Sequence, residues 1–263
     1  MKKISPLIVV LILIAVYVGS CRTEYFQPSE PPFSSRTGHP AIPPQIAAGE
    51  REEPVISVYI AEKETVEQMG IEEYIAGVVA GEMDPQWPLA ALAAQAILAR
   101  TFTLQKIAEN GGVPQRGAHA STDIEEFQAY SAEDITDRVR EAVRITRGEV
   151  ACHKEQFIRA WFNAYAGPKT ALADEGLAFK TNPPYIHIVE SPGQDIIPPE
   201  EGEWSAGFTL EQVRNAVIET TGKDPGPVQE VKVSEYGPSG RVASFLVNDC
   251  KISAPGLRLS LGS

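Results

Sequence analysis

The sequence predicts an α+β fold, and three patterns support this prediction. Apolar residues follow helical spacing over much of residues 66–109. A run rich in Val, Ile and Tyr at residues 55–60 is typical of a strand. Apolar residues alternate on both sides of a Gly-Pro-Ser-Gly turn at residues 237–240, as they do in a β-hairpin. We expect a single domain in which a helical N-terminal part, including the helix that carries Glu82, packs on a mixed or antiparallel β portion.

Local signals set the element boundaries in chain order. The strand VISVYI opens the domain, and the helix after it ends where Asp84 and Pro85 interrupt the periodicity. Pro88 is well placed as the first residue of the next, alanine-rich helix. A short hairpin with its turn near His153 is expected further on. The expected helices are 66–82, 88–109, 132–145 and 209–221, and the expected strands are 55–60, 148–152, 157–163, 229–235 and 241–247.

The first 21 residues have the three-part layout of a secretory signal. Lys2 and Lys3 precede a continuous apolar run from Leu7, and small residues come just before Cys21. The tetrapeptide VGSC resembles the bacterial lipobox, so we expect residues 1–20 to be a signal peptide and Cys21 to carry lipid. The mature protein would then be a membrane-anchored lipoprotein of the cell envelope, outside the cytoplasm. The alternative is an uncleaved anchor helix, because the apolar run approaches the roughly 20 residues that a span needs.

Residues 21–54 have the composition of a linker. They contain seven prolines and little apolar periodicity, so they bury too little surface to offset the entropy of ordering them. A semi-extended spacer between membrane and domain is expected. Residues 55–263 are long enough for one domain with a sizeable core.

The balance of charge and the few cysteines exclude several classes of function. The net charge is −12, without a long Lys/Arg run, so neither nucleic acid nor an anionic lipid surface is an expected partner. If Cys21 carries lipid, Cys152 and Cys250 remain as a potential disulfide, which the sequence leaves open. It contains no CxxC motif and no His/Cys cluster with zinc spacing, so no metal or cofactor is predicted.

Two charged residues occupy helical faces that are otherwise apolar. At about 100° per residue, Glu82 falls near the centre of the face that Ile71 and Val78 define, and Arg100 lies on the face of Leu92. Desolvation favours the neutral form of a carboxyl group, and a carboxyl group that holds a proton can act as a general acid. The alternative is a buried Glu82–Arg100 ion pair that ties two helices together.

The stretch IEEYIAGVVAGEMDPQWPLAALAAQAILARTFTL, residues 71–104, resembles the signature of the sporulation stage II protein D family, also called the amidase-enhancer domain. The resemblance continues more loosely through FQAY, which contains Tyr130, and through IRAWFNAYAG. It resumes at PSGRVASFLVNDCKISAPGLRLSLGS and so covers most of residues 55–263.

This resemblance implies peptidoglycan chemistry. Members characterised as enzymes are lytic transglycosylases, which cut between N-acetylmuramic acid and N-acetylglucosamine and leave a 1,6-anhydro end. Their catalytic acid/base corresponds to Glu82. The resemblance also implies that Arg100, Gln95 and Tyr130 contact the substrate or orient the acid.

The chain departs from the family pattern near several of these positions. Asp84-Pro85 replaces a direct Met-Pro, and residues 90–94 lack the usual Glu and Lys. Residues 166–168 read Ala-Gly-Pro where relatives have Ser-Gly-Gly. Asn163 and Tyr165 are assigned to this loop as substrate contacts. The departures put substrate contacts in doubt more than the chemistry.

Two hypotheses of different class follow. In the first, the protein is a lytic transglycosylase that acts on peptidoglycan glycan strands, with Glu82 indispensable. In the second, it is a non-catalytic peptidoglycan-binding partner that stimulates a cell-wall amidase, and Glu82 is half of an ion pair. The two hypotheses differ in their products, because only the first predicts glycan fragments with 1,6-anhydro ends.

Overall fold

The computed structural model describes residues 38–48, 52–191 and 205–262. The expected signal peptide, Cys21 and most of the expected linker lie outside these residues. No helix in this part of the chain combines the length and the apolar character that crossing a bilayer requires.

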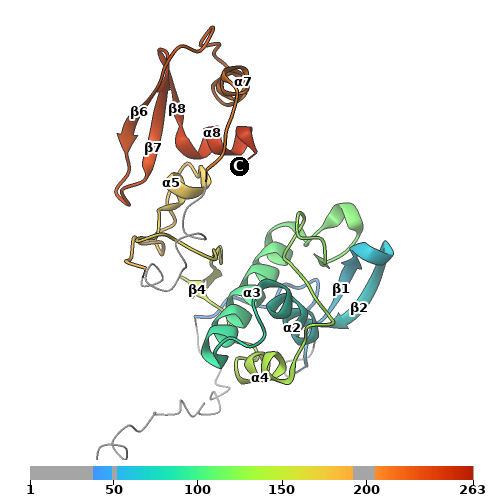
Figure 1. Ribbon diagram of the computed structural model, residues 1–263. Helices are drawn as coiled ribbons and strands as arrows, with labels where there is room; N and C mark the ends of the chain where they lie inside the picture. The colour runs from blue at the N-terminus through green and yellow to red at the C-terminus, as the bar shows by residue number, and fades with distance from the viewer. Residues whose placement is uncertain (1–37, 49–51, 192–204, 263) are drawn as a thin grey trace, which may run out of the picture.

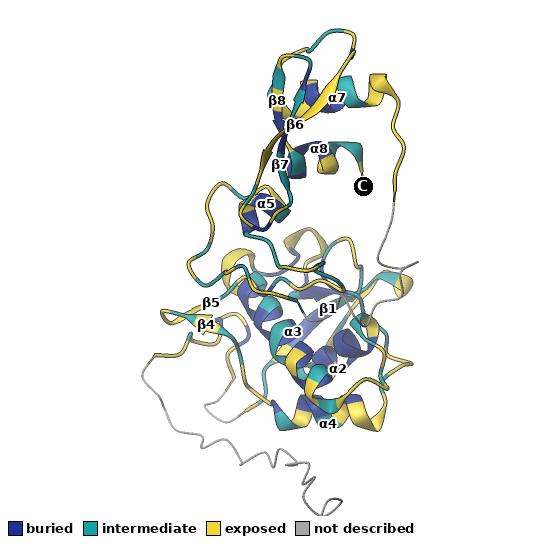
Figure 2. Cartoon of the chain, turned by 60° about the vertical axis from the view of Figure 1, so that its left-hand side comes forward, coloured by how far each residue is buried: buried dark blue, intermediate teal, exposed yellow. Residues whose placement is uncertain are grey.

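The N-terminal part combines a mixed sheet with a cluster of helices (Figure 1). The central strand β1 pairs antiparallel with β2 and parallel with the short β3. Helices α2, α3 and α4 pack on one another, and their buried faces share one apolar cluster with β1 (Figure 2). The elements are β1 (Val55–Ile60), η1 (Ala61–Lys63), β2 (Thr65–Gly70), α2 (Ile71–Glu82), α3 (Leu89–Asn110), η2 (Pro114–Arg116), β3 (Ala120–Ser121) and α4 (Asp137–Ile145).

Strand β2 corrects the helix expected from residue 66. Residues 65–70 pair with β1 in a continuous register, from Ile60 opposite Thr65 to Val55 opposite Gly70. Because this pairing is a tertiary contact, it overrides a local periodicity that also suits a helix. Helix α2 therefore begins only at Ile71.

The C-terminal part is a smaller α+β unit with its own apolar cluster. Strands β6, β7 and β8 form an antiparallel sheet in that order, and α7 and α8 pack on each other and on this sheet. Val217, Val247 and Ile252 are at the centre of the cluster. Strand β6 is an edge strand, and all six of its residues are exposed. The bounds are α5 (Ala173–Leu177), α7 (Leu210–Thr221), β6 (Val231–Tyr236), β7 (Val242–Val247), β8 (Cys250–Ser253) and α8 (Ala254–Leu261).

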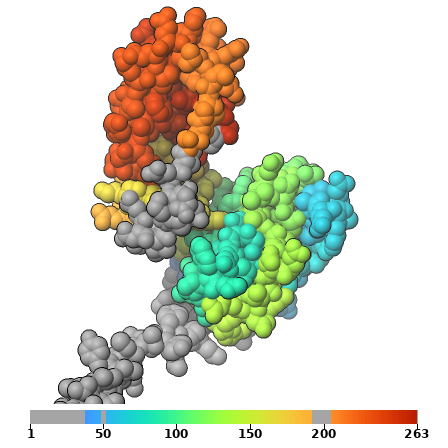
Figure 3. All heavy atoms as spheres, in the orientation of Figure 1, coloured from blue at the N-terminus to red at the C-terminus, as the bar shows by residue number. Residues whose placement is uncertain are grey.

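The space-filling view shows the two parts as two lobes (Figure 3). The chain between them carries a small hairpin of β4 (Cys152–His153) and β5 (Gln156–Phe157). Lys154 and Glu155 form its turn with positive φ angles of 49° and 64°. The hairpin was expected, but its strands are two residues each, shorter than the predicted 148–152 and 157–163.

The α+β class and the hairpin around residues 237–240 are confirmed. Two helices differ from expectation, and a side chain caps the start of each. The Thr136 hydroxyl accepts a hydrogen bond from Val139 N at 3.3 Å, so α4 begins at residue 137 and not at 132. Helix α8 was not expected. It begins directly after its N-cap residue Ser253, whose hydroxyl accepts a hydrogen bond from Gly256 N at 3.2 Å.

Cys152 and Cys250 are both free thiols. Cys152 lies in the β4–β5 hairpin, whereas Cys250 lies in the sheet of the C-terminal part. The disulfide that the sequence left open is therefore not formed.

Candidate active site at the end of helix α2

Glu82 is the last residue of α2, and its partial exposure follows from how the helix ends. Met83 leaves the helical conformation, with φ −138° and ψ 150°, while its N–H still donates to Val79 O at 3.1 Å. The chain then turns away through Asp84 and Pro85. The Glu82 side chain thus stands at an open helix end, between buried and exposed.

One oxygen of this carboxylate is held by the backbone. Ala129 N donates a hydrogen bond to Glu82 Oε1 at 2.8 Å. No other hydrogen bond within the described ranges reaches the carboxylate, so Oε2 is available to another molecule. This asymmetry orients the group without occupying both of its oxygens.

The segment that donates this bond lies directly on two glycines of α2. A Cβ atom at Gly81 would stand 2.6 Å from Tyr130 N, and one at Gly77 would stand 2.1 Å from the Tyr130 ring. Ser131 N donates to Gly77 O at 3.0 Å and fixes the same segment. Residues 127–131, here called the docking segment, therefore need both glycines to reach Glu82.

Two stacked tyrosines support the docking segment. The rings of Tyr74 and Tyr130 are 5.7 Å apart and nearly parallel, and the Tyr74 hydroxyl donates to Ser121 O at 3.0 Å. Burial, with smaller effects of Tyr130 and Glu82, raises the pKa of Tyr74 well above its usual value. Burial also raises the pKa of Tyr130. Both phenols remain protonated at neutral pH.

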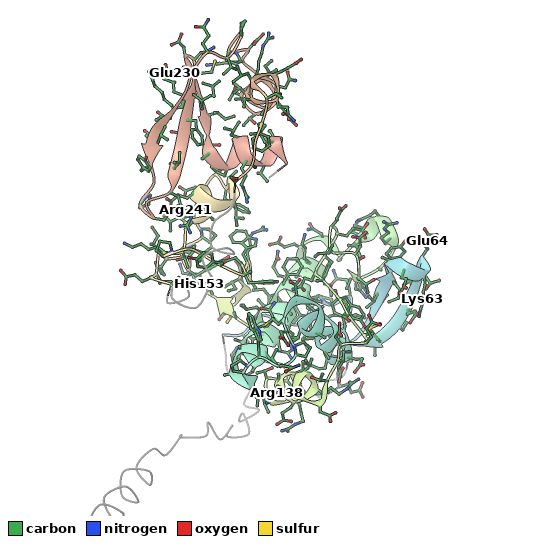
Figure 4. The ribbon with its side chains drawn as sticks, viewed as in Figure 1. Lys63, Glu64, Arg138, His153, Glu230 and Arg241 are labelled. Carbon is green, nitrogen blue, oxygen red and sulfur yellow. The ribbon has the colours of Figure 1, made fainter. Side chains whose placement is uncertain are left out.

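The turn after Glu82 presents a large aromatic side chain. Asp84 Oδ1 accepts from Gln86 N at 2.8 Å, and Trp87 N donates to Asp84 O at 3.0 Å. Arg138 of α4, which is labelled in Figure 4, donates to Trp87 O at 3.1 Å and so ties the turn to the helical cluster. Trp87 itself is 50% exposed, which is unusual for the largest apolar side chain.

The structure gives Arg100 a different partner from the expected one. Its Nε and Nη2 donate to Glu72 Oε1 and Oε2 at 3.0 and 2.6 Å, and its Nη1 donates to Glu149 O at 2.9 Å. The Glu82–Arg100 ion pair considered from the sequence is therefore wrong. Arg100 is only 1% exposed and is part of the helix-packing core.

The remaining sequence candidates lie in different surroundings. Gln95 is buried, and within the described chain its Nε2 has no hydrogen-bond partner. Asn163 is exposed and Tyr165 is partly exposed, both on the chain between β5 and α5. Tyr130 differs from these three residues, because it directly follows Ala129, whose N–H binds Glu82.

His119 has a structural role. Its Nδ1 accepts from Ser57 N at 3.1 Å, and burial lowers its pKa. Among the residues that the structure describes, no group of three or more His, Cys, Asp or Glu side chains is arranged to hold a metal ion.

Sequence reasoning missed the role of Ala129, because a backbone N–H leaves no trace in residue type. The available signal was the pair Gly77 and Gly81, four residues apart and thus on one helical face. Two glycines on the same helical face leave room for another segment to approach the helix closely.

Comparisons with known proteins cover the part of the chain that contains this candidate site. The family model SpoIID, described as stage II sporulation protein, matches residues 59–153, which include Glu82 and the docking segment. The stage II sporulation protein D of Bacillus subtilis is 28% identical over 220 residues, covering 79% of this chain and 62% of the relative. An uncharacterized protein of Brachyspira hyodysenteriae is 34% identical over 122 residues, covering 46% of this chain and 32% of the relative.

A third relative carries a different name. The amidase enhancer of Bacillus subtilis is 27% identical over 145 residues, covering 55% of this chain and 18% of the relative. The chain thus spans less than two thirds of the length of each of these three relatives.

Proposed function

We propose that the chain is a peptidoglycan lytic transglycosylase, because residues 59–153 match the stage II sporulation protein family SpoIID. It would cut glycan strands between N-acetylmuramic acid and N-acetylglucosamine and leave 1,6-anhydromuramic ends. The observation that carries the proposal is the single carboxylate at the end of α2, with Oε1 held by Ala129 N and Oε2 available.

One carboxyl group suffices for both proton transfers of this reaction. Protonated Glu82 gives its proton to the glycosidic oxygen as the bond to the anomeric carbon breaks. The resulting carboxylate takes the proton of the muramic 6-hydroxyl, whose oxygen forms the new bond to the same anomeric carbon. The group ends protonated, as it began, and no water is consumed.

The side chains around Glu82 supply candidates for holding the glycan. Trp87 offers an exposed aromatic face on the turn after Glu82, and aromatic rings pack well on the apolar faces of sugars. Tyr130 lies beside the residue that holds Glu82. Gln95, Asn163 and Tyr165 remain proposed substrate contacts.

The expected cellular setting suits this substrate. With a signal peptide and a lipidated Cys21, the protein would face peptidoglycan from a membrane of the cell envelope. A cell-wall amidase is a proposed partner, since one relative is named an amidase enhancer.

The alternative is a protein that binds peptidoglycan and stimulates an amidase without cleaving glycan itself. The similarity to the amidase enhancer favours it, although that match covers a small share of the relative. In this case Glu82 would hold the docking segment in place through Ala129 N and do no chemistry.

The deciding experiment compares wild type with Glu82→Gln on purified glycan strands, with and without stem peptides, by mass spectrometry of the products. Glu73→Gln is a matched control, because Glu73 lies on the same helix and forms an exposed ion pair with Arg140. We expect 1,6-anhydromuramic ends from wild type and Glu73→Gln and none from Glu82→Gln. Strands that are bound but uncut by all three proteins would support the alternative.

A further inference from the structure

A cavity of about 420 Å³ lies in the C-terminal part between α5, β7 and α8. Pockets of this size hold small ligands in other proteins. The lining is mostly apolar, but two arginines stand in it. The residues that line the cavity include Val242, Phe245, Leu257, Leu261, Arg241 and Arg258.

These two arginines differ from most others in the chain. Among the described residues seven arginines pair with a carboxylate, and only Arg138, Arg241 and Arg258 do not. In a chain with 35 acidic and 23 basic residues, cations without an acidic partner are unexpected. Two of the three line the same cavity.

Most of the donor atoms of both guanidinium groups are free. Arg241 Nη2 donates to the backbone oxygens of Ala166 and Lys169, and Arg258 Nη2 donates to Gly176 O at 3.4 Å. Within the described ranges neither Nε nor Nη1 of these arginines has a hydrogen-bond partner. Figure 4 shows Arg241 at the end of the sheet that faces α5.

The carboxylate in the cavity wall does not use these donors. Glu175 is buried, and its Oε1 accepts from Ser239 N at 3.2 Å and from the Ser239 hydroxyl at 2.8 Å. Its Oε2 accepts from Leu172 N at 3.3 Å. Two guanidinium groups and one carboxylate leave the cavity with one net positive charge, which a single carboxylate ligand would balance.

We propose that this cavity binds the free carboxylate end of a short peptide whose last side chain is small and apolar. Arg241 and Arg258 hold the carboxylate with their free N–H donors, and Phe245 and Leu261 receive the side chain. Two sources share this chemistry: wall peptides that end in D-alanine, and ordinary peptides that end in an L-residue.

The test is a binding titration of the full chain with acetyl-D-alanyl-D-alanine and acetyl-L-alanyl-L-alanine, each as free acid and as amide. We expect the acid to bind about tenfold more tightly than the amide. A preference for the D-peptide identifies the wall as the source, and equal binding of both acids identifies peptide ends in general.

Variants separate the cavity from the rest of the surface. Arg258→Gln should abolish the preference for the acid, and since Arg258 is exposed its loss should leave the fold intact, which circular dichroism checks. Arg214→Gln is the control in the same part, because Arg214 pairs with Asp224 outside the cavity. Glu82→Gln should bind the peptide acid as tightly as wild type does, because Glu82 does not line this cavity. The binding test is therefore independent of the proposed glycan cleavage. The proposal would be overturned if wild type bound the acid and the amide equally, or if Arg258→Gln kept the wild-type preference for the acid.

Discussion

Arg100 and Glu72 form a two-point ion pair across the helical hairpin of α2 and α3, with both oxygens of Glu72 bonded to the guanidinium group. The pair joins the start of α2 to the middle of α3, whereas Glu82 lies at the opposite end of α2. The structural carboxylate and the candidate catalytic carboxylate are thus separated along one helix.

Glu72→Gln should therefore lower stability strongly without being a direct test of catalysis. It leaves the charge of Arg100 buried without a counter-ion, which costs about 3 kcal/mol of unfolding free energy. Urea unfolding followed by circular dichroism measures this. Glu73→Gln, the same change one residue later in an exposed ion pair, should leave the unfolding midpoint nearly unchanged. Equal effects of the two variants would contradict a special role for Glu72.

Gly81→Ala should reduce glycan cleavage by about tenfold or more while the helix content stays constant. Its new Cβ would stand 2.8 Å from the Ala129 carbonyl carbon, so the docking segment must move and its bond to Glu82 is lost. Alanine itself favours the helix, so loss of helical structure is not the expected cause. Gly207→Ala meets no atom within 4 Å and is the control. Full activity of Gly81→Ala would show that the docking segment does not position the carboxylate.

Trp87→Ala should raise the KM for glycan strands by about fivefold with little change in stability, because half of the side chain is exposed. Trp161→Ala is the comparison, since Trp161 packs edge-on against Phe179 with ring centres 4.6 Å apart. That variant should lower the thermal midpoint instead. Steady-state kinetics and thermal unfolding of both variants test this separation of roles.

His119 should make stability depend on pH below neutrality. Burial lowers its pKa from 6.5, so the unfolded chain binds this proton more readily than the folded chain. The contribution of neutral His119 to the unfolding free energy is complete above pH 6.5. It is lost as the pH falls from 6.5 through the pKa of His119 in the folded chain. Protonation would also remove Nδ1 as acceptor for Ser57 N. Thermal unfolding at several pH values should show a smaller acid-side loss for His119→Gln than for wild type.

The sequence predicted local features better than long-range ones. The bounds of β1 and α3 follow from apolar patterns and proline signals, and they were right to within one residue. The helical wheel placed Arg100 on a buried face, where it lies. It could not name the counter-ion, because the wheel of one helix does not show whether Glu72 or Glu82 of α2 lies opposite Arg100.

What the sequence could not predict depends on segments that meet only in the fold. β2 forms because β1 pairs with it, and the bond from Ala129 N to Glu82 spans 47 positions. A backbone donor has no residue-type signature, so only the glycines beneath it pointed to the contact. The cavity with Arg241 and Arg258 likewise needs residues from α5, β7 and α8 together.

The exposed edge strand β6 bears on the risk of self-association. Val231, Val233 and Tyr236 are exposed on a strand that, within the described chain, pairs with one other strand, an arrangement that invites pairing with another chain. Lys232 and Glu235 interrupt these apolar residues, and both form ion pairs, with Glu230 and Lys251. Charges at these two positions act as gatekeepers against edge-to-edge aggregation, so the strand can stay open without pairing with a second copy of the chain.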